Sequence, residues 1–228
     1  MMRIGIVGGV GPLAAANFYR RVIELSPASR DEDHLPVVLV SEQVPSRVEH
    51  LLGRGPSPVQ ALQRAVRMLT AAGVGAIAVP SATTHAYLPD MQAVTEVEIF
   101  DLLGETAREI EQGDFDRVMI LATRATVHLR LFETRLRHCV PEYPDIEGQN
   151  VVDQLIEQVK RGAPEPPLRE RLQRVVSSWS GSDVAVVLGC TELGVIASEP
   201  PAGVTVIDAS EVLARRVVRS ALTLTGTR

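Results

Sequence analysis

The feature that most constrains the fold is a regular alternation of short apolar runs with longer segments of helical period. In the first half, the β-branched runs at residues 3–9, 36–42 and 76–81 are separated by helical patterns at 12–25 and 58–72. This alternation is typical of strand–helix–strand units, in which helices cover both faces of a parallel sheet. The chain is therefore predicted to be an α/β protein.

The second half repeats this rhythm. Its predicted elements are, in order, a strand at 117–123, helices at 129–137, 149–161 and 168–180, and strands at 183–189 and 205–210. The stretch RGAPEPPL, residues 161–168, is expected to be a loop because its prolines interrupt any helical period.

The two halves also resemble each other in sequence. The segment that begins at Arg3 aligns with the one that begins at Arg117, 114 residues later, and Ser81 aligns with Cys190 at an offset of 109. Identity is low, so a chance likeness between buried strands is the alternative explanation. Two pseudo-symmetric lobes would face the carboxyl ends of their strands toward each other, where open α/β sheets bind ligands. Ser81 and Cys190 would then lie opposite each other across one cleft.

Length, charge and hydropathy exclude several classes of function. The chain of 228 residues, with 45% hydrophobic and 22% charged residues, is typical of a globular protein with an ample core. A net charge of −5 and the lack of a basic block argue against a nucleic-acid partner. No apolar run reaches the roughly 18–20 residues of a membrane span, and no leader sequence is recognisable. We therefore expect a cytoplasmic protein that binds a small molecule.

A glycine-rich turn follows the first predicted strand. Its sequence, GGVGPLA at residues 8–14, fits the Gly-x-Gly-x-x-Ala pattern of dinucleotide-binding turns. However, Pro12 removes an amide donor that a pyrophosphate would use, and Glu42, the candidate ribose-binding acid, lies farther from the glycines than usual. A turn around Gly9 whose backbone amides are free to bind a small anion is the preferred interpretation.

Hydroxyl side chains follow the third strand of the first half in the stretch PSATTH, residues 80–85. One of Ser81, Thr83 or Thr84 is expected to cap the next helix. The same helix start could bind a carboxylate through its free amides. His85 is either a packed histidine or a group that polarises Ser81.

The stretch GCTEL, residues 189–193, places Cys190 at the start of a predicted helix. A helix N-terminus stabilises a thiolate and lowers the thiol pKa from about 8.5 toward neutrality. Cys190 is therefore predicted to act as a base, although an inert buried cysteine is the common alternative. Cys139, at the end of a predicted helix, lacks such a setting and is interpreted as structural. Two cysteines 51 positions apart form neither a disulfide framework nor a metal-binding motif.

Two cations are candidate ligands for carboxylates. Arg47, in VPSRVEHL, follows the second strand at the edge where the cleft is expected, and its planar guanidinium suits a carboxylate. An ordinary surface arginine is the alternative. Lys160, in QVKRG, is a weaker candidate because it lies at a helix end.

With these residues identified, the chain resembles the cofactor-independent aspartate/glutamate racemase family over nearly its whole length. The segments that carry the resemblance are IGIVGGVGPLA, VPSRVEHL, VPSATTHAY, LATRATV, GQNVVDQLIEQVKRG, LGCTELGV and VIDAS. The resemblance implies an active site in a cleft between two lobes, formed by residues 1–102 with 208–228 and by residues 103–207. It also implies a homodimer and two cysteines that act on opposite faces of an amino acid, with neither pyridoxal phosphate nor metal.

The family motifs assign roles to residues of this chain. The resemblance implies that Cys190 is the second catalytic cysteine and that Arg47, assisted by Lys160, binds the side-chain carboxylate of an acidic substrate. The α-carboxylate and the rest of the substrate would be held by Gly9, Ala82, Thr83, Thr84, Thr126, Thr191 and Glu192. The first loop lacks the Asp-Ser pair of cell-wall glutamate racemases, which indicates the aspartate-racemase branch.

The chain departs from this family at the first catalytic cysteine. The family motif Pro-Cys-Asn-Thr-Ala-His reads Pro-Ser-Ala-Thr-Thr-His here, with Ser81 in place of the cysteine. A serine hydroxyl is a much weaker acid than a thiol, so Ser81 is a poor base unless a neighbour activates it. Three functions remain open.

The first is an asymmetric racemase in which Cys190 is the base and Ser81 serves the other face. The second is a single-cysteine decarboxylase or lyase, similar to arylmalonate decarboxylases, in which hydroxyls of the SATT stretch stabilise an enediolate. The third is a ligand-binding homologue without catalysis.

Overall fold

The computed structural model of the chain describes residues 1–113, 115–179 and 184–223. Its strands form two parallel four-stranded sheets, with the orders β2-β1-β3-β4 and β6-β5-β7-β8. The strands are β1 Ile4–Gly8, β2 Val37–Ser41, β3 Ala76–Ala78, β4 Glu98–Ile99, β5 Arg117–Leu121, β6 Pro141–Glu142, β7 Val184–Leu188 and β8 Thr205–Asp208. Each sheet thus has the same order of its own four strands, as two pseudo-symmetric halves require.

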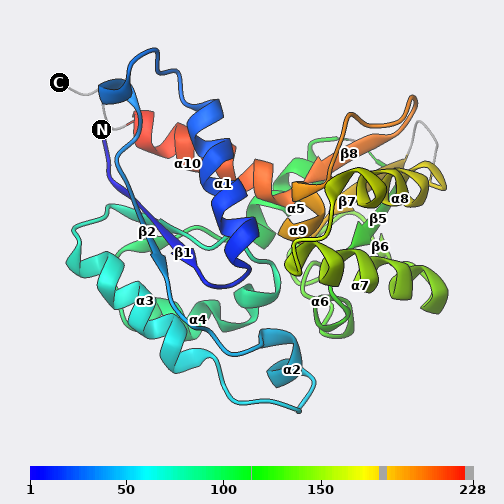
Figure 1. Cartoon of the computed structure of the whole chain (residues 1–228), viewed down its shortest axis with the longest axis horizontal. Helices are drawn as coiled ribbons and strands as arrows, with labels where there is room; N and C mark the ends of the chain where they lie inside the picture. Colours follow the sequence, from blue (N-terminus) through cyan, green and yellow to red (C-terminus); the bar gives the residue numbers. More distant parts are fainter. Residues whose placement is uncertain (114, 180–183, 224–228) are drawn as a thin grey trace.

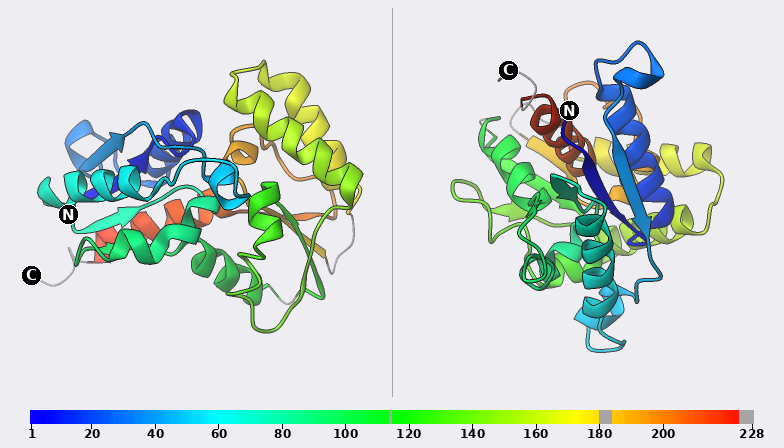
Figure 2. Two further views of the ribbon diagram at one scale, coloured as in Figure 1. Left: turned by 90° about the horizontal axis from the view of Figure 1, so that it is seen from below. Right: turned by 90° about the vertical axis from the view of Figure 1, so that its left-hand side faces the viewer.

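Helices cover both faces of each sheet (Figure 1). They are α1 Pro12–Leu25, α2 Arg47–Leu51, α3 Val59–Ala71, α4 Leu88–Gln92, α5 Leu102–Glu111, α6 Arg124–His128, α7 Ile146–Lys160, α8 Glu165–Ser177, α9 Thr191–Val195 and α10 Ala209–Thr223, with the short 3-10 helices η1 Asp31–Asp33 and η2 Thr83–Tyr87. Helix α10 packs against α1 and α5, so the last helix of the chain returns to elements of the first half. Figure 2 shows the two halves side by side.

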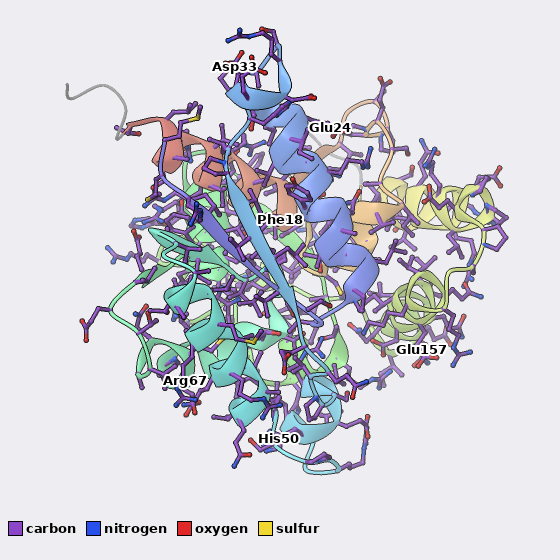
Figure 3. The ribbon with its side chains drawn as sticks, turned by 60° about the vertical axis from the view of Figure 1, so that its left-hand side comes forward. Phe18, Glu24, Asp33, His50, Arg67 and Glu157 are labelled. Atoms are coloured by element: carbon purple, nitrogen blue, oxygen red, sulfur yellow. The ribbon has the colours of Figure 1, made fainter. Side chains whose placement is uncertain are left out.

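The buried strands alternate between two core regions because their side chains point to opposite faces of the sheet. In β1, Ile4 and Ile6 pack in one cluster with Phe18 of α1, whereas Val7 packs in another with Leu62 of α3. Figure 3 shows Phe18 on the inner side of α1 and Glu24 near its outer end. The cluster around Ile4 also contains Val118 of β5, so one apolar core is shared by both sheets. This shared core fixes the position of one half relative to the other.

The structure corrects two predictions for the second half. The helix predicted at 129–137 is wrong, because α6 spans Arg124–His128 and turns follow it. Arg130 has φ 51, a left-handed conformation that ends the helix. The loop predicted at 161–168 is shorter than expected, because α8 begins at Glu165 with prolines in its first turn, where no intrahelical amide bond is lost. The predicted helix end at 180 and strand start at 183 lie outside the described residues.

In the described part of the chain, no helix combines the length and the apolar character needed to cross a lipid bilayer. The division into lobes at residues 102 and 208 stays a prediction, and residues 224–228 of the first lobe lie outside the described part.

Gly9 and Gly73 allow backbone strain to be separated from steric overlap. Both have positive φ, 73 and 69. A Cβ on Gly9 would lie 1.9 Å from the carbonyl oxygen of Glu42, whereas no atom lies within 4 Å of a Cβ on Gly73. We predict that Gly73→Ala lowers the free energy of unfolding by about 1 kcal/mol through strain alone, and that Gly9→Ala loses a further ~1–3 kcal/mol through overpacking. Urea unfolding of both variants tests this, and equal losses would contradict it.

Candidate active site

The candidate active site lies where loops at the carboxyl ends of the strands of both sheets meet. A small cavity there, of about 10 Å³, is lined by Ser81 from the loop after β3 and by Cys190 from the loop after β7. The two sheets therefore bring the predicted pair together at one cavity. The other predicted residues that line it are Arg47, Ala82, Thr83, Lys160, Thr191 and Glu192. Thr84 and Thr126 reach it through hydrogen bonds to residues that do line it.

The cavity at Cys190 is closed in this structure. Its volume is about 10 Å³, which is enough for about one water molecule and too small for an amino acid. Two larger pockets, of about 650 and 680 Å³, flank it, and Ser46, Val48 and Lys160 line both. The short helix α2, which Figure 1 shows at the edge of the first half, carries Val48, and none of its residues is buried. Val48 also lines the small cavity, so α2 borders all three of these spaces.

The pKa of the Cys190 thiol is shifted in the direction opposite to the prediction. It is the N-cap of α9, with extended backbone, and it is 6% exposed. Its Sγ donates a hydrogen bond to Glu192 Oε2 at 3.0 Å. Burial raises the pKa of the Cys190 thiol well above its usual value, and the negative charge of Glu192 raises it further, while Lys160 opposes both. The expected lowering by the helix start is therefore wrong, because α9 has only five residues and its first turn carries a buried carboxylate.

Glu192 connects the thiol to the glycine-rich turn. Its Oε2 accepts from Cys190, and its buried Oε1 has no hydrogen-bond partner among the described residues. A Cβ on Gly11 would lie 2.6 Å from Oε1, so the turn before α1 can approach this carboxylate only because residue 11 is glycine. The anion beside this turn is thus a side chain of the protein itself, where the sequence suggested space for an external anion. Gly9 lines the pocket of about 650 Å³ instead of the small cavity.

Ser81 is held as a hydrogen-bond donor to the cavity. The hydroxyl of Thr84 donates to Ser81 Oγ at 2.8 Å, which leaves the hydroxyl proton of Ser81 available to another acceptor. His85 does not contact this hydroxyl, since its Nδ1 donates to the Ser81 carbonyl at 2.8 Å and its Nε2 accepts from the amide of Leu102 at 3.0 Å. Burial lowers the pKa of His85, so its ring is neutral. His85 therefore does not polarise the Ser81 hydroxyl directly, and Thr84 is the side chain that contacts Ser81 Oγ.

Three threonines from both halves form a cluster beside the cavity. Thr83 Oγ1 lies 2.9 Å from both Thr123 Oγ1 and Thr126 Oγ1, and the last two are 3.0 Å apart. The hydroxyl of Thr123 also caps α6 by accepting from the Thr126 amide at 3.3 Å. The expected hydroxyl cap after Pro80 is absent, because η2 has Ala82 at its N-cap and no side-chain cap bond. Thr123 was missed from the sequence, although its place directly after β5 signals the same sheet edge.

Two cations border the cavity. Arg47 is the first residue of α2, where Ser46 caps the helix, and its buried Nε has no hydrogen-bond partner among the described residues. Burial lowers the pKa of Arg47, while the nearby acidic groups, Glu192 first, oppose this shift. Lys160 ends α7, and its Nζ lies 4.0 Å from Glu192 Oε1. In this site the carboxylate of Glu192 already contacts Cys190 and Lys160, whereas the guanidinium of Arg47 can bind a second carboxylate.

Cys139 lies apart from this site. It follows the turns after α6, not a helix, and its side chain packs against the shared core. Burial raises the pKa of its thiol, with a smaller contribution from Glu111. Among the described residues, no group of three or more His, Cys, Asp or Glu side chains could hold a metal ion.

Comparisons with known proteins agree with this architecture. The sequence family described as Asp/Glu/hydantoin racemase matches residues 7–217. The broad specificity amino-acid racemase RacX of Bacillus subtilis (strain 168) is 25% identical over 224 residues, covering 96% of this chain and 98% of that protein. Picrophilus torridus aspartate racemase superimposes with a TM-score of 0.87 at 29% identity, covering 97% of this chain and 94% of that one. Glutamate racemase from Thermus thermophilus gives a TM-score of 0.62 at 21% identity, covering 98% and 82%. The two-lobe fold predicted from the sequence is confirmed.

The Cys190–Glu192 contact predicts how the thiol titrates. With Cys139→Ser as background, we expect the thiolate absorbance of Cys190 near 240 nm to be absent at neutral pH and to develop only at alkaline pH, because burial and Glu192 both raise the thiol pKa. Glu192→Gln removes the neighbouring negative charge and should move the titration to lower pH. A thiol that ionises near neutrality, or that titrates unchanged in Glu192→Gln, would contradict this electrostatic description.

Proposed function

The chain belongs to the Asp/Glu/hydantoin racemase family, and on this premise we propose that it interconverts the enantiomers of an acidic amino acid. The observation that carries the proposal is the placement of Ser81 and Cys190 at one cavity, with Arg47 beside them. Aspartate is the first substrate to test, because the likeness to Picrophilus torridus aspartate racemase extends over 97% of the chain. A homodimer that needs no pyridoxal phosphate is part of the same proposal.

The substrate carboxylates are assigned to opposite ends of the cavity. The α-carboxylate would bind the hydroxyls of Thr83 and Thr123, supported by Thr126, and the amide and hydroxyl of Thr191. These donors stabilise the negative charge that reaches the carboxylate oxygens when the α-proton leaves. The side-chain carboxylate would pair with Arg47, whose Nε is otherwise unsatisfied.

Proton transfer begins at Cys190. The thiol proton moves from Sγ to Glu192 Oε2 along the existing 3.0 Å hydrogen bond, which leaves a thiolate and a neutral carboxylic acid. The thiolate then takes the α-proton, the C–H electron pair moves into the carboxylate as an enediolate, and an S–H bond forms. The charge of the pair is unchanged in the first step, so a buried site can produce a thiolate without gaining net charge.

Ser81 completes the inversion from the other face. Its hydroxyl accepts from Thr84 and so presents its own proton to the enediolate. The Ser81 alkoxide is then reprotonated from solvent, and Glu192 releases to solvent the proton that it took from Cys190, which restores both groups. The reverse direction requires Ser81 to abstract a proton, which a hydroxyl does far less well than a thiolate. The enzyme is therefore proposed to exchange the α-proton much faster in the enantiomer whose α-hydrogen faces Cys190, while inversion has the same kcat/KM in both directions because the enantiomers are equal in free energy.

The threonine cluster also favours a second candidate, a single-cysteine decarboxylase. Loss of carbon dioxide from a malonate leaves an enediolate without any base, and Cys190 alone could then protonate it. Thr83, Thr123 and Thr126 would stabilise the enediolate oxygens. Carbon dioxide release from a series of substituted malonates would identify this activity, whereas the free guanidinium of Arg47 favours the racemase.

Isotope exchange at the α-carbon tests the racemase proposal. In deuterated water, we expect one enantiomer of aspartate or glutamate to exchange its α-proton at least about tenfold faster than the opposite enantiomer, because Ser81 is the weaker base. Inversion should be detectable from either enantiomer. Proton NMR follows exchange, and chiral chromatography follows inversion. Cys190→Ala should abolish both, and Ser81→Cys should raise α-proton exchange in the enantiomer that exchanges slowly.

Thr70→Ser provides a matched control, because Thr70 is a hydroxyl residue on α3 that lies outside the cavity. Its rates should equal those of the unmodified protein. Unchanged exchange in Cys190→Ala would overturn the assignment of the base, and an absence of exchange with every acidic amino acid tested would overturn the proposed function.

A further inference from the structure

Two aspartate–arginine pairs occupy equivalent places in the two halves. Asp101 follows β4, the last strand of the first sheet, and its Oδ2 accepts from Arg135 Nε at 2.7 Å. Asp208 ends β8, the last strand of the second sheet, and its Oδ2 lies 3.1 Å from Arg21 Nη2. Each carboxylate thus stands at the carboxyl end of the outermost strand next to the site.

Each arginine comes from the opposite half of the molecule. Arg21 lies in α1, which follows β1 of the first sheet, and it reaches the carboxylate of the second sheet. Arg135 lies in the turns after α6, which follows β5 of the second sheet, and it reaches the carboxylate of the first. The two arginines are 114 residues apart, the same offset that aligns Arg3 with Arg117. The two pairs are therefore counterparts under the internal symmetry, and each connects one half to the other.

The Arg21–Asp208 pair holds the end of α9. Arg21 Nη2 also donates to the carbonyl oxygen of Gly194 at 3.0 Å. A Cβ on Gly194 would lie 2.5 Å from Asp208 Oδ2, so the carboxylate packs directly against the helix backbone. Helix α9 has five residues, begins after Cys190 and carries Glu192 in its first turn. Any displacement of Gly194 is therefore transmitted to Cys190 within little more than one helical turn.

Burial makes this pair sensitive to the loss of one partner. The side chains of Arg21 and Asp208 are 18% and 8% exposed. Burial raises the pKa of Asp208, and Arg21 opposes that shift. Removal of the guanidinium would leave a buried carboxyl group uncompensated behind α9.

The Arg135–Asp101 pair stands behind Ser81. Asp101 caps α5 by accepting from the Gly104 amide at 3.1 Å. The next amide, that of Leu102, donates to His85 Nε2, and His85 Nδ1 donates to the carbonyl oxygen of Ser81. Arg135 thus supports the start of α5, and the start of α5 fixes the histidine that holds the main chain of Ser81.

We propose that these two pairs are reciprocal clamps, in which Arg21 with Asp208 positions Cys190 and Glu192, and Arg135 with Asp101 positions Ser81. None of the four clamp residues lines the Cys190 cavity, so they act through the groups they hold. The consequence for catalysis rests on the proposed racemase function. Each half of the molecule therefore supplies an arginine that sets the reacting group of the other half.

Arg21→Ala tests the clamp behind Cys190, with Arg215→Ala as the matched control. Arg215 also pairs with Glu211, which Arg21 contacts, and with Glu109, and neither of these two ion pairs involves a residue of α9. We expect exchange of the Cys190-facing α-proton to fall about 10–100-fold in Arg21→Ala, as for a reacting group displaced by a fraction of an ångström to 1 Å. The rate in Arg215→Ala should stay within about twofold.

Arg135→Ala tests the clamp behind Ser81. Because Cys190 keeps its position, α-proton exchange should stay within about twofold, while inversion falls about tenfold or more through misplacement of Ser81. This change in the ratio of exchange to inversion distinguishes positioning from a general loss of stability, which would lower both rates together.

Alkylation of Cys190 needs no substrate, so it tests the clamp independently of the proposed function. In the Cys139→Ser background, iodoacetamide should alkylate Cys190 at least about threefold faster in Arg21→Ala, because the thiol is only 6% exposed while α9 is held. Arg135→Ala and Arg215→Ala should alkylate at the unmodified rate. If the unmodified protein shows no exchange with any acidic amino acid, the proposed function fails, and the alkylation rates alone decide the clamp behind Cys190.

The clamps are overturned if Arg21→Ala and Arg215→Ala behave alike in exchange and in alkylation. They are also overturned if the ratio of exchange to inversion is the same in Arg135→Ala as in Arg21→Ala. Should Arg21→Ala fail to fold, Arg21→Lys is the replacement, because a lysine keeps the charge but cannot bind Gly194, Asp208 and Glu211 together. It should change exchange and alkylation in the same directions, by smaller factors.

Discussion

The candidate active site depends on a hydrogen bond between two buried acids, the thiol of Cys190 and the carboxylate of Glu192. Both groups are less than a tenth exposed, and the cavity beside them has room for about one water molecule. Two anions cannot be held side by side in so dry a place, so the pair keeps one proton between them. That shared proton explains why the sulfur is a thiol at rest and why the carboxylate of Glu192 is the group that can accept the thiol proton. Lys160 and Arg47 supply positive charge beside this pair, which also suits the proposed substrate with its two carboxylates.

The repeated architecture is what brings these groups together. Each sheet has the same strand order, and the two sheets share one apolar core. The loops at the carboxyl ends of their strands therefore meet at one place. The hydroxyl of Ser81 comes from one half and the sulfur of Cys190 from the other. The repeat is nevertheless unequal in chemistry, because Ser81 is held by Thr84 and a neutral His85, whereas Cys190 is held by a carboxylate. An asymmetric site on a symmetric scaffold is the basis of the proposed inequality in α-proton exchange between the two enantiomers.

The sequence was sufficient to predict the fold and most of the residues that line the cavity at Cys190, but it missed Thr123 and placed Gly9 there wrongly. Strongly periodic segments such as α1 were predicted to the residue, and the aligned halves placed Ser81 and Cys190 at one cleft. The sequence could not show the direction of the Glu192 side chain or the burial of Cys190, which are tertiary effects and which reverse the expected pKa shift. The helix predicted after α6 failed for a similar reason, because apolar spacing cannot reveal a left-handed residue such as Arg130.

The most direct test of the central claim is a crystal structure of the protein with a bound dicarboxylate such as aspartate. The account predicts that α2 is displaced or closed over the ligand, that the α-carbon lies between Cys190 Sγ and Ser81 Oγ, and that one carboxylate contacts the threonine cluster. A ligand bound elsewhere, for example in the separate pocket of about 610 Å³ near Arg215, with the cavity at Cys190 still closed, would contradict it.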